Sequence, residues 1–380
     1  MESIDELSNY DIVVGIPTFN EEDSVRYVVE MVDEGLNKYF SEYKSLILNV
    51  DSNSEDKTIE VVKATRTVNH KESYICPSAI SGKGANILEM FNVVKDTGAK
   101  YFIMVDGDLK SINGEWIPKF LNPLINKEVD YITPIYSRNR YDGNITNHFC
   151  LPILFGLLGT TVNQPIAGDF AMSRDFILKI LSLETPESIY KYGIDIFLTI
   201  NALTGKFKHS EVYLGRKIHK PGLGKIVNTF KSVAETLLQM IPSIERNNVL
   251  SRKMIKLKRA DRFINKPSSE KIEYLRKYAY DAIELLDDSV VEKYLGLRKV
   301  HIREVNMELW VTILNNMINY ILRNNSKNLN YKEMVDIIAP FFFLRVLHYY
   351  VELDSMPSDI IIEKQSKLFR EVRLLNEIKN

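Results

Sequence analysis

The sequence predicts an α/β protein built on a mainly parallel, Rossmann-like sheet, followed by a helical C-terminal region. Two observations carry this prediction. Short apolar segments alternate with helix-like segments through the first 220 residues, as in βαβ units. From about Lys225 onward glycine nearly disappears, and Leu, Ile, Lys and Glu recur at helical spacing. A chain of 380 residues is long enough for two or three domains. We therefore expect one domain over residues 1–224 and a helical domain over residues 225–380.

The expected strands are continuous apolar segments bounded by turn residues, which is typical of strands buried on both faces. They are Asp11–Ile16, Ser45–Val50, Tyr101–Val105 and Val129–Tyr136. Helices are expected between the first three of them and after them, over Glu22–Leu36, Asp56–Thr67, Gly84–Thr97, Ile226–Ile241, Ser269–Leu286, Val290–Leu297, Val305–Arg323 and Tyr331–Glu352.

Composition narrows the class of protein. The formal net charge of −1 argues against sequence-independent binding to nucleic acid, which needs a basic excess. Two cysteines, Cys76 and Cys150, exclude a disulfide scaffold and a Cys-based zinc site, and they fit a reducing cytoplasm. The acidic, polar segment Met1–Tyr10 does not resemble a signal peptide. We expect a cytoplasmic protein.

Two apolar segments are candidates for membrane spans. Cys150–Val162 is shorter than the ~20 residues that cross a bilayer. Ile338–Leu353 contains Arg345, His348 and Glu352, so a core helix explains it better. The basic segment Arg252–Lys266 is expected to be a solvated helix face or linker, with an anionic surface or acidic partner as the alternative.

Polar motifs follow the first two predicted strands, at the strand ends where open parallel sheets bind ligands. In Ile16–Glu22 (IPTFNEE), Pro17 stops the strand, and Asn20 or Glu21 is placed to cap the next helix. In Asp51–Thr58 (DSNSEDKT), a carboxylate at the strand end is placed to accept hydrogen bonds from a base or a ribose. Each motif alone is equally typical of an ordinary turn.

A third motif, Ser81–Asn86 (SGKGAN), opens a helix. Its glycines allow close approach of a ligand to the backbone, and Lys83 offers a positive charge to a phosphate. The spacing is not that of a P-loop, so an ATPase is not predicted.

The fourth motif is Asp106-Gly107-Asp108, directly after a predicted buried strand. Two carboxylates at this spacing are able to face one divalent cation, and oxygen ligands select Mg²⁺ or Mn²⁺. The motif is weak by itself, because acidic turns are common on protein surfaces. Its place after three other strand-end motifs favours a metal site.

As an ordered set, these motifs resemble the nucleotide-sugar-binding half of family 2-like glycosyltransferases of the GT-A fold. The resemblance covers Asp11–Leu109 and implies that the motifs contact, in turn, the nucleotide, its base or ribose, the diphosphate and a metal ion. The nucleotide-sugar-binding residues that it implies in this part of the chain are Pro17, Thr18, Asn20, Glu21, Asp51, Ser52, Lys83 and Gly107.

Four later segments resemble mannosylglycerate synthase and the glucosyl- and mannosyl-3-phosphoglycerate synthases, which are retaining enzymes. The segments are Asp142–Thr146, Gln164–Phe170, Tyr192–Asp195 and Leu214–His219. By this resemblance Asp108 and His219 hold the metal, and Gly168, Asp169 and Asp195 border the donor sugar. A lone His is more often a surface or core residue. The apolar stretch Val212–Leu214 before His219 and the resemblance together favour a ligand, and imidazole suits Mn²⁺.

The resemblance also implies an acceptor pocket, formed by Arg138, Asp142, Gly143, Asn144 and Thr146. Relatives that use phosphoglycerate carry Arg where this chain has Asn144, and Asn offers no charge-assisted contact to phosphate. This departure favours free glycerate, although Arg138 or the nearby Arg140 is able to serve a carboxylate or a phosphate instead.

We therefore expect a metal-dependent, retaining glycosyltransferase that moves a hexose, mannose or glucose, from a GDP- or UDP-sugar to glycerate or 3-phosphoglycerate. The residues expected to act in catalysis are Lys83, Asp106, Asp108 and Asp195. A homodimer is compatible with this expectation; nucleic acid and stable membrane insertion are not expected. The alternatives are a lipid-phosphate or polysaccharide acceptor, and a catalytically inert nucleotide-sugar-binding protein.

Overall fold

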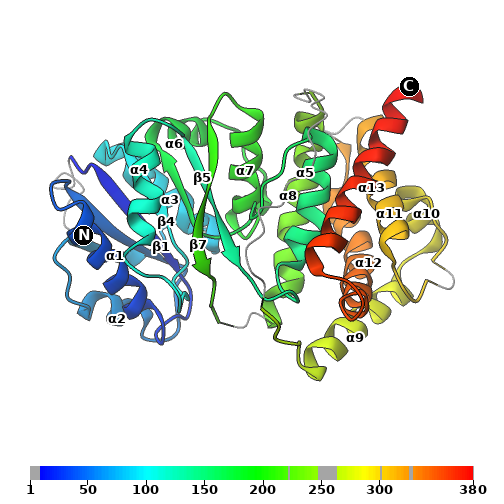
Figure 1. Ribbon diagram of the computed structural model, residues 1–380, viewed down its shortest axis with the longest axis horizontal. Helices are drawn as coiled ribbons and strands as arrows, with labels where there is room; N and C mark the ends of the chain where they lie inside the picture. The colour runs from blue at the N-terminus through cyan, green and yellow to red at the C-terminus, as the bar shows by residue number, and fades with distance from the viewer. Residues whose placement is uncertain (1–8, 221–222, 247–262, 300–301, 325–327, 380) are drawn as a thin grey trace. The chain divides into compact units, whose positions relative to one another are not determined.

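The computed structural model describes residues 9–220, 223–246, 263–299, 302–324 and 328–379 (Figure 1). They group into two compact units. The first unit contains Met1–Ser137 and Ile166–Pro221, and the second contains Arg138–Pro165 and Gly222–Asn380. Most of the basic segment Arg252–Lys266 lies outside the described residues.

The first unit is built on a seven-stranded sheet with the order β3-β2-β1-β4-β6-β5-β7. Its strands are β1 (Ile12–Thr18), β2 (Ser45–Asp51), β3 (His70–Ile75), β4 (Tyr101–Met104), β5 (Tyr131–Ser137), β6 (Phe170–Ser173) and β7 (His209–Arg216). Neighbouring strands are parallel except at β6, which runs antiparallel to both β4 and β5. The predicted mixed, mainly parallel α/β sheet is confirmed.

Helices cover this sheet in two groups, in which α1 contacts α2 and α4, and α3 contacts α6 and α7. Their bounds are α1 Val25–Tyr39, α2 Thr58–Ala64, α3 Lys83–Thr97, α4 Trp116–Ile125, α6 Arg174–Leu181 and α7 Ile194–Thr204, with a short 3₁₀ helix, η3, at Glu187–Tyr190. Every residue of β1 and of β2 is buried. This is why their sequences are continuously apolar rather than alternating.

The sequence located the apolar strands β1, β2, β4 and β5 within two residues but missed β3 and β6, and marked β7 only at its apolar centre. β3 is an edge strand of sequence HKESYI and is mostly half-buried, with His70 and Ile75 exposed, so it lacks an apolar run. β6 has four residues and lies inside a segment that was interpreted as a motif. Short or exposed strands depend on pairing with neighbours more than on their own composition.

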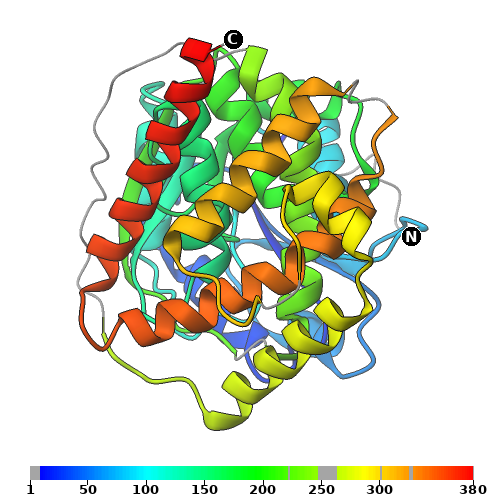
Figure 2. The same cartoon turned by 90° about the vertical axis from the view of Figure 1, so that its right-hand side faces the viewer.

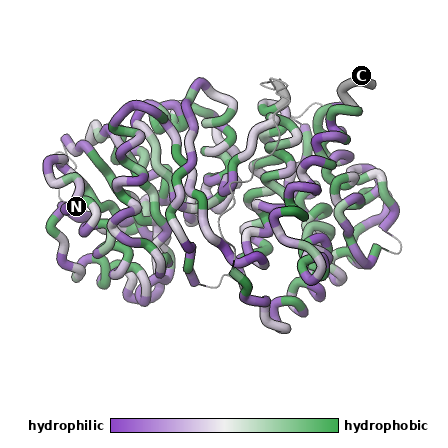
Figure 3. Tube along the Cα trace, viewed as in Figure 1, coloured by the Kyte–Doolittle hydropathy of each residue, from purple (hydrophilic) through white to green (hydrophobic). Residues whose placement is uncertain are grey.

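The second unit is helical, as predicted (Figure 2). Its elements are η2 Thr146–Cys150, α5 Leu151–Leu158, η4 Leu223–Lys225, α8 Ile226–Arg246, α9 Ser269–Leu285, α10 Asp288–Leu295, α11 Met307–Arg323, α12 Tyr331–Glu352 and α13 Ser358–Lys379. Helix α13 was not predicted. Along α13, hydrophobic and hydrophilic residues alternate in Figure 3, and its buried residues include Ile362 and Phe369.

The predicted domain boundary needs a correction. Residues 138–165 were assigned to the first domain, whereas the structure groups them with the helices of the second unit. The reason is α5, whose residues Leu151–Leu157 are all buried and which packs against α13. An apolar helix of this kind must be buried against other elements, and α5 packs on α13 and α8.

One described helix, α12, is long and apolar enough to cross a membrane by length and composition. However, 78% of its most apolar stretch is buried inside the protein. α12 packs against α8 and α9, and α9 runs beside it in Figure 2. This burial favours the interpretation of Ile338–Leu353 as part of a core helix.

Candidate active site

The topology of the sheet brings the predicted motifs to one edge. Because β1, β2, β4, β5 and β7 share a direction, their carboxyl ends lie at the same edge. β6 runs the other way, so Gly168 and Asp169, just before its first residue, arrive at that edge too. Ligands bind at this edge in open α/β sheets.

A buried cluster of alternating charges occupies this edge, with Asp106 at its centre. Lys83 Nζ lies 2.7 Å from Asp106 Oδ1, and Lys217 Nζ lies 3.1 Å from Asp106 Oδ2. Lys217 Nζ also lies 2.6 Å from Asp169 Oδ2, and Lys83 Nζ lies 3.4 Å from Asp195 Oδ2. Two lysines thus join three carboxylates that come from distant parts of the sequence.

The lysines determine the ionisation of Asp106. Burial alone would raise the pKa of this carboxyl group, but Lys83 and Lys217 outweigh burial and hold its pKa well below the usual range. Conversely, Asp106 and Asp195 raise the pKa of Lys83 against the effect of burial. Asp106 and Lys83 are therefore both charged at neutral pH.

Asp108 lies in a different environment. Burial and the neighbouring charge of Asp106 raise its pKa to about 6. Its Oδ2 lies 3.9 Å from His219 Nδ1, and that nitrogen lies 2.8 Å from the backbone oxygen of Lys220. In the neutral imidazole, Nδ1 would donate to this carbonyl and Nε2 would keep the lone pair.

This pair fits the predicted divalent cation. A carboxylate and an imidazole suit Mn²⁺, and a hard cation commonly takes its remaining ligands from water and substrate phosphates. Within the described part of the chain, no group of three or more His, Cys, Asp or Glu side chains forms a complete metal site. The protein therefore offers Asp108 and His219 as a partial ligand set.

Two glycines allow the cluster to pack so closely. Gly168 has a φ of +85°, and a Cβ there would lie 2.1 Å from Asp106 Oδ2. A Cβ on Gly107 would lie 2.7 Å from Thr18 Cγ2 and 3.2 Å from the backbone oxygen of Pro17. Any side chain at either glycine would collide with its neighbours. These two predicted site residues therefore contribute by having no side chain, which lets the cluster pack closely.

Asp195 keeps one oxygen for a ligand. It lies in the first turn of α7, where its Oδ2 meets Lys83. Its Oδ1 is buried and has no hydrogen-bond partner among the described residues. Burial raises the pKa of this carboxyl group, with Lys83 opposing. A buried acceptor without a partner is costly, and a sugar hydroxyl would satisfy it.

The loops after β1 and β2 are joined to each other. Asp51 is fully buried and accepts hydrogen bonds from Thr18 Oγ1 at 2.6 Å and from the Ser54 backbone nitrogen at 2.6 Å. Asn20, which has a φ of +58°, accepts from the backbone nitrogen of Glu55 at 2.9 Å. Asp51 therefore organises the loop in this structure.

The predicted cap of the first helix is wrong. α1 begins at Val25 with Ser24 as its N-cap residue, so neither Asn20 nor Glu21 caps it. Glu21 instead pairs with Lys220 at 2.9 Å. Pro17 lies within β1, because the strand continues one residue further, to Thr18.

Ser52 faces the start of α3. Its Oγ donates to Asn86 Oδ1 at 3.1 Å, and Asn86 Nδ2 donates to the backbone oxygen of Thr18 at 3.4 Å. Asn86 therefore ties the ends of β1 and β2 to α3.

The predicted acceptor residues all belong to the second unit. Asn144 is buried, and its Nδ2 donates to the backbone oxygen of Tyr141 at 2.9 Å and to Tyr350 Oη at 3.0 Å. Thr146 begins η2, a π-helical turn of the kind often found at functional sites.

Two cations lie near this turn. Asp142 Oδ1 is 3.8 Å from Lys271 Nζ. A Cβ placed on Gly143 would lie 3.9 Å from Arg138 Nη1. Arg138 therefore lies beside the turn.

Sequence reasoning missed Lys217, Lys220, Asn86, Tyr136 and Lys271. Lys217 lies within Leu214–His219 and Asn86 within Ser81–Asn86, so a lysine or an asparagine inside a strand-end motif was the available signal. Tyr136 donates to Asp169 Oδ2 at 2.5 Å from inside an apolar strand, where it resembles a core residue. Lys271 lies on α9, far from any motif.

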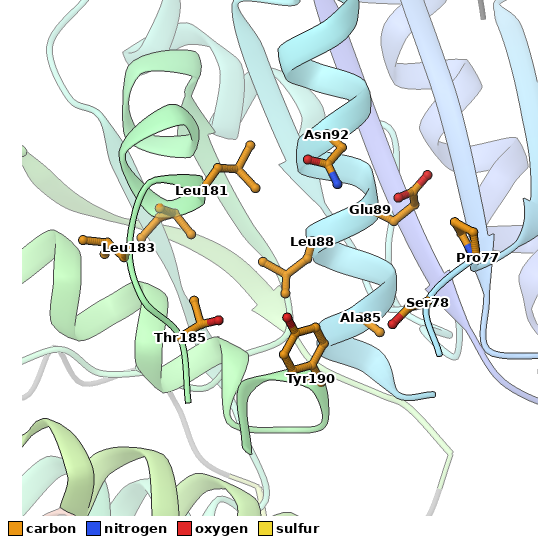
Figure 4. A pocket seen from close by; sticks show the side chains of 11 residues that line it. Pro77, Ser78, Ala85, Leu88, Glu89, Asn92, Leu181, Leu183, Thr185 and Tyr190 are labelled. Carbon is orange, nitrogen blue, oxygen red and sulfur yellow. The ribbon is translucent and has the colours of Figure 1, made fainter. Parts of the chain in front are cut away.

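A separate pocket of about 350 Å³ lies between α3 and α6 in the first unit (Figure 4). Leu88, Glu89 and Asn92 line it from α3, and Leu181 and Tyr190 line it from the other side. It shares no lining residue with the charged cluster, so it is a different feature of the surface.

Comparisons with known proteins bear on the fold and the family. Residues 13–178 match the model of the glycosyl transferase family 2. Solved structures of glucosyl-3-phosphoglycerate synthase from Mycobacterium tuberculosis share the fold. One, in complex with phosphoglyceric acid, has a TM-score of 0.50 at 24% identity, covering 62% of this chain and 83% of that chain. Another, in complex with Mn²⁺ and UDP-glucose, has a TM-score of 0.50 at 23% identity, covering 63% and 83%.

The matched family segment contains all but the first residue of β1, all of β2 to β6, and the four charged residues of the sheet edge that precede α7: Lys83, Asp106, Asp108 and Asp169. Residues 13–178 therefore form a glycosyl transferase family 2 domain on the GT-A plan, and the protein is a glycosyltransferase.

Proposed function

We propose that this glycosyltransferase moves a hexose from a nucleoside diphosphate sugar to a small hydroxy acid, glycerate or its 3-phosphate. We further propose that Mg²⁺ or Mn²⁺ is the cofactor and that the anomeric configuration is retained. Structures of the Mycobacterium tuberculosis synthase contain UDP-glucose, phosphoglyceric acid, and Mn²⁺ or Mg²⁺, which supports the choice of substrates and metal. Both cysteines are free thiols, which supports a cytoplasmic reaction.

The observation that carries the proposal is the charge balance at the sheet edge. Four carboxylates and two lysines meet there, so the ionised site has two more negative than positive charges. A diphosphate would be repelled from such a site by itself. A divalent cation would balance the excess and let the diphosphate approach.

The residues of the first unit have distinct roles in this proposal. Asp108 and His219 would hold the cation, which supplies positive charge to the departing diphosphate. Lys83 would donate a charge-assisted hydrogen bond to a phosphate oxygen, because Asp106 and Asp195 hold its ammonium group in place. Asp195 Oδ1 would accept a hydrogen bond from a hydroxyl of the donor sugar.

The acceptor is proposed from the resemblance and from the turn at Asp142–Asn144. Asn144 uses its amide nitrogen on Tyr141 and Tyr350, and it brings no positive charge. Arg138, near Gly143, supplies one cation for an acid group, and the second nearby cation, Lys271, is paired with Asp142. One cation suits a carboxylate better than a carboxylate and a phosphate together, so we propose that free glycerate is preferred.

The donor and the metal are tested by a transfer assay with purified protein. UDP-glucose, GDP-glucose and GDP-mannose are each combined with D-glycerate or 3-phosphoglycerate, with Mg²⁺, Mn²⁺ or a chelator. We expect one donor to be used with either acid only when metal is present, and the anomeric configuration of the product, determined by NMR, to match that of the donor. Transfer in the presence of chelator, or no transfer to either acid, would overturn the proposal.

The acceptor preference is tested by comparing kcat/KM for the two acids. We expect Asn144→Arg to shift the ratio toward 3-phosphoglycerate, most strongly at low salt, where charge interactions are least screened. Wild-type preference for 3-phosphoglycerate that disappears in Arg138→Ala would show instead that Arg138 binds the phosphate.

A further inference from the structure

Lys217 is a buried cation at the centre of the charged cluster. Its side chain is 4% exposed, and its Nζ lies 2.6 Å from Asp169 Oδ2, 2.7 Å from the backbone oxygen of Ala167 and 3.1 Å from Asp106 Oδ2. It also lies 5.3 Å from the centre of the Tyr136 ring. A lysine buried to this extent is retained only where its charge is paired.

The hydrogen bonds of Asp106 show what Lys217 does. Lys83 occupies Oδ1 of Asp106 and Lys217 occupies Oδ2. The backbone nitrogen of Asp106 donates to Asp169 Oδ1 at 2.9 Å, and Asp169 is itself held by Lys217. Asp106 is therefore fixed at its backbone and at both oxygens.

Asp108, two residues further along, is treated differently. No lysine lies within ion-pair distance of it among the described residues, and its described ion-pair partner is His219 at 3.9 Å. The two carboxylates of Asp106-Gly107-Asp108 are thus distinguished by Lys217: one is neutralised from within the protein, and the other is left to a ligand.

We propose that Lys217 is a positioning residue that neutralises Asp106, reserving it as the support of Lys83, and so leaves Asp108 and His219 to bind the divalent cation. The proposal rests on the proposed function for the nature of the two ligands, a divalent cation and a nucleoside diphosphate. It adds that the charge of Lys217 weakens the binding of the cation and strengthens the binding of the nucleoside diphosphate.

The consequence is measurable as binding, without turnover. Lys217→Met keeps much of the length of the side chain and removes its charge, so the site gains one unit of net negative charge. Mn²⁺ added alone should then bind three- to tenfold more tightly. UDP or GDP added without metal should bind at least tenfold more weakly, because the site repels it and Asp106 is free to draw Lys83 away. Calorimetry with each ligand alone measures both affinities.

A merely structural role for Lys217 would give a different result. Loosening of the site would lower the affinities for Mn²⁺ and for the nucleoside diphosphate together, and this result would overturn the proposal. Lys110→Met is the matched control, since Lys110 is exposed and its backbone nitrogen contacts the backbone oxygen of Ile218, next to Lys217. It removes one positive charge nearby and should change both affinities less than twofold.

Two further variants keep the test valid if Lys217→Met does not fold. Lys217→Arg keeps the charge and should keep the ratio of the two affinities near that of the wild type. Asp169→Asn removes a negative partner of Lys217 and should act in the opposite sense, weakening Mn²⁺ and strengthening the diphosphate. Unchanged affinities in Asp169→Asn would overturn the positioning role of Lys217 but not the proposed function. Wild-type protein that binds neither ligand would overturn the proposed function, and this inference with it.

Discussion

Asp106 and Asp108 stand two residues apart in one turn, and their surroundings act on them in opposite ways. Lys83 and Lys217 hold the pKa of Asp106 low despite burial, whereas burial and the charge of Asp106 raise the pKa of Asp108 to about 6. Keeping Asp108 ionised and buried beside Asp106 without a divalent cation costs energy. A bound divalent cation would release that energy.

The first prediction concerns Asp108→Asn. In metal-free protein at neutral pH this change should stabilise the fold, because a carboxyl group with a raised pKa disfavours the folded state when it is ionised. Each pKa unit corresponds to about 1.4 kcal/mol, so the gain is at most about 3 kcal/mol. Transfer activity should fall by orders of magnitude in the same variant. Thermal denaturation and the transfer assay measure the two effects.

Asp96→Asn is the control, because Asp96 is half exposed and pairs with its neighbour Lys95. It should leave both stability and activity nearly unchanged. A lower melting temperature for metal-free Asp108→Asn would show that Asp108 is a structural residue.

The second prediction concerns Lys83. Lys83→Ala should weaken the binding of a nucleoside diphosphate about 10–150-fold, since a charge-assisted hydrogen bond contributes about 1.5–3 kcal/mol. Lys95→Ala, on the exposed last turn of the same helix, is the control. Calorimetry with UDP and GDP decides the matter, and equal affinities for Lys83→Ala and the wild type would place Lys83 outside the diphosphate site.

At the scale of elements, the start of α3 depends on its contact with η3. The Gly84 backbone nitrogen donates to the backbone oxygen of Lys191 at 2.9 Å. A Cβ on Gly84 would lie only 1.6 Å from the backbone oxygen of Ile189. Because the obstacle is backbone, no rotamer change relieves it, and the two elements would have to separate.

The third prediction follows from this contact. Gly84→Ala should push α3 away from η3, displace Lys83, lower the melting temperature, and weaken nucleoside diphosphate binding at least tenfold. Gly224→Ala is the matched control, because a Cβ there meets nothing within 4 Å. The close contact between Gly84 and Ile189 is refuted if both variants have the melting temperature and the nucleoside diphosphate affinity of the wild type.

At the scale of the whole molecule, the chain enters the second unit twice. It does so first at residues 138–165 and again after Pro221. Within that unit, Arg370 Nη1 donates to the backbone oxygen of Phe155 at 3.0 Å, and a Cβ on Gly156 would lie 2.3 Å from Phe369 Cδ1. Helix α5 is thus packed closely on the last helix of the chain.

The fourth prediction is that a fragment of residues 1–224 does not fold cooperatively. It retains α5 but lacks α13, so the apolar face of α5 would be exposed to water. Binding of a hydrophobic dye and the shape of the thermal transition measure this. The same fragment with residues 138–165 replaced by a flexible linker should bind less dye. A sharp transition in the unmodified fragment would support a domain boundary at residue 224.

Predictability differed among elements for physical reasons. Strands β1, β2 and β4 were located because complete or nearly complete burial leaves an apolar run in the sequence. β3 carries no such run, because an edge strand with exposed side chains is held by its neighbour β2. The predicted bounds of helix α12, Tyr331–Glu352, are confirmed, although Pro340 lies inside the helix.

The sequence by itself determined the α/β class, the helical C-terminal region, and the motifs that carry Lys83, Asp106 and Asp108, because these depend on local composition and spacing. The tertiary structure alone decided the rest. The reversed direction of β6 brings Asp169 to the sheet edge. Lys217 directly follows β7 and there contacts both Asp169 and Asp106. Charge pairing between residues more than 40 positions apart leaves no local pattern, since it depends on strand order and burial rather than on neighbours in the chain.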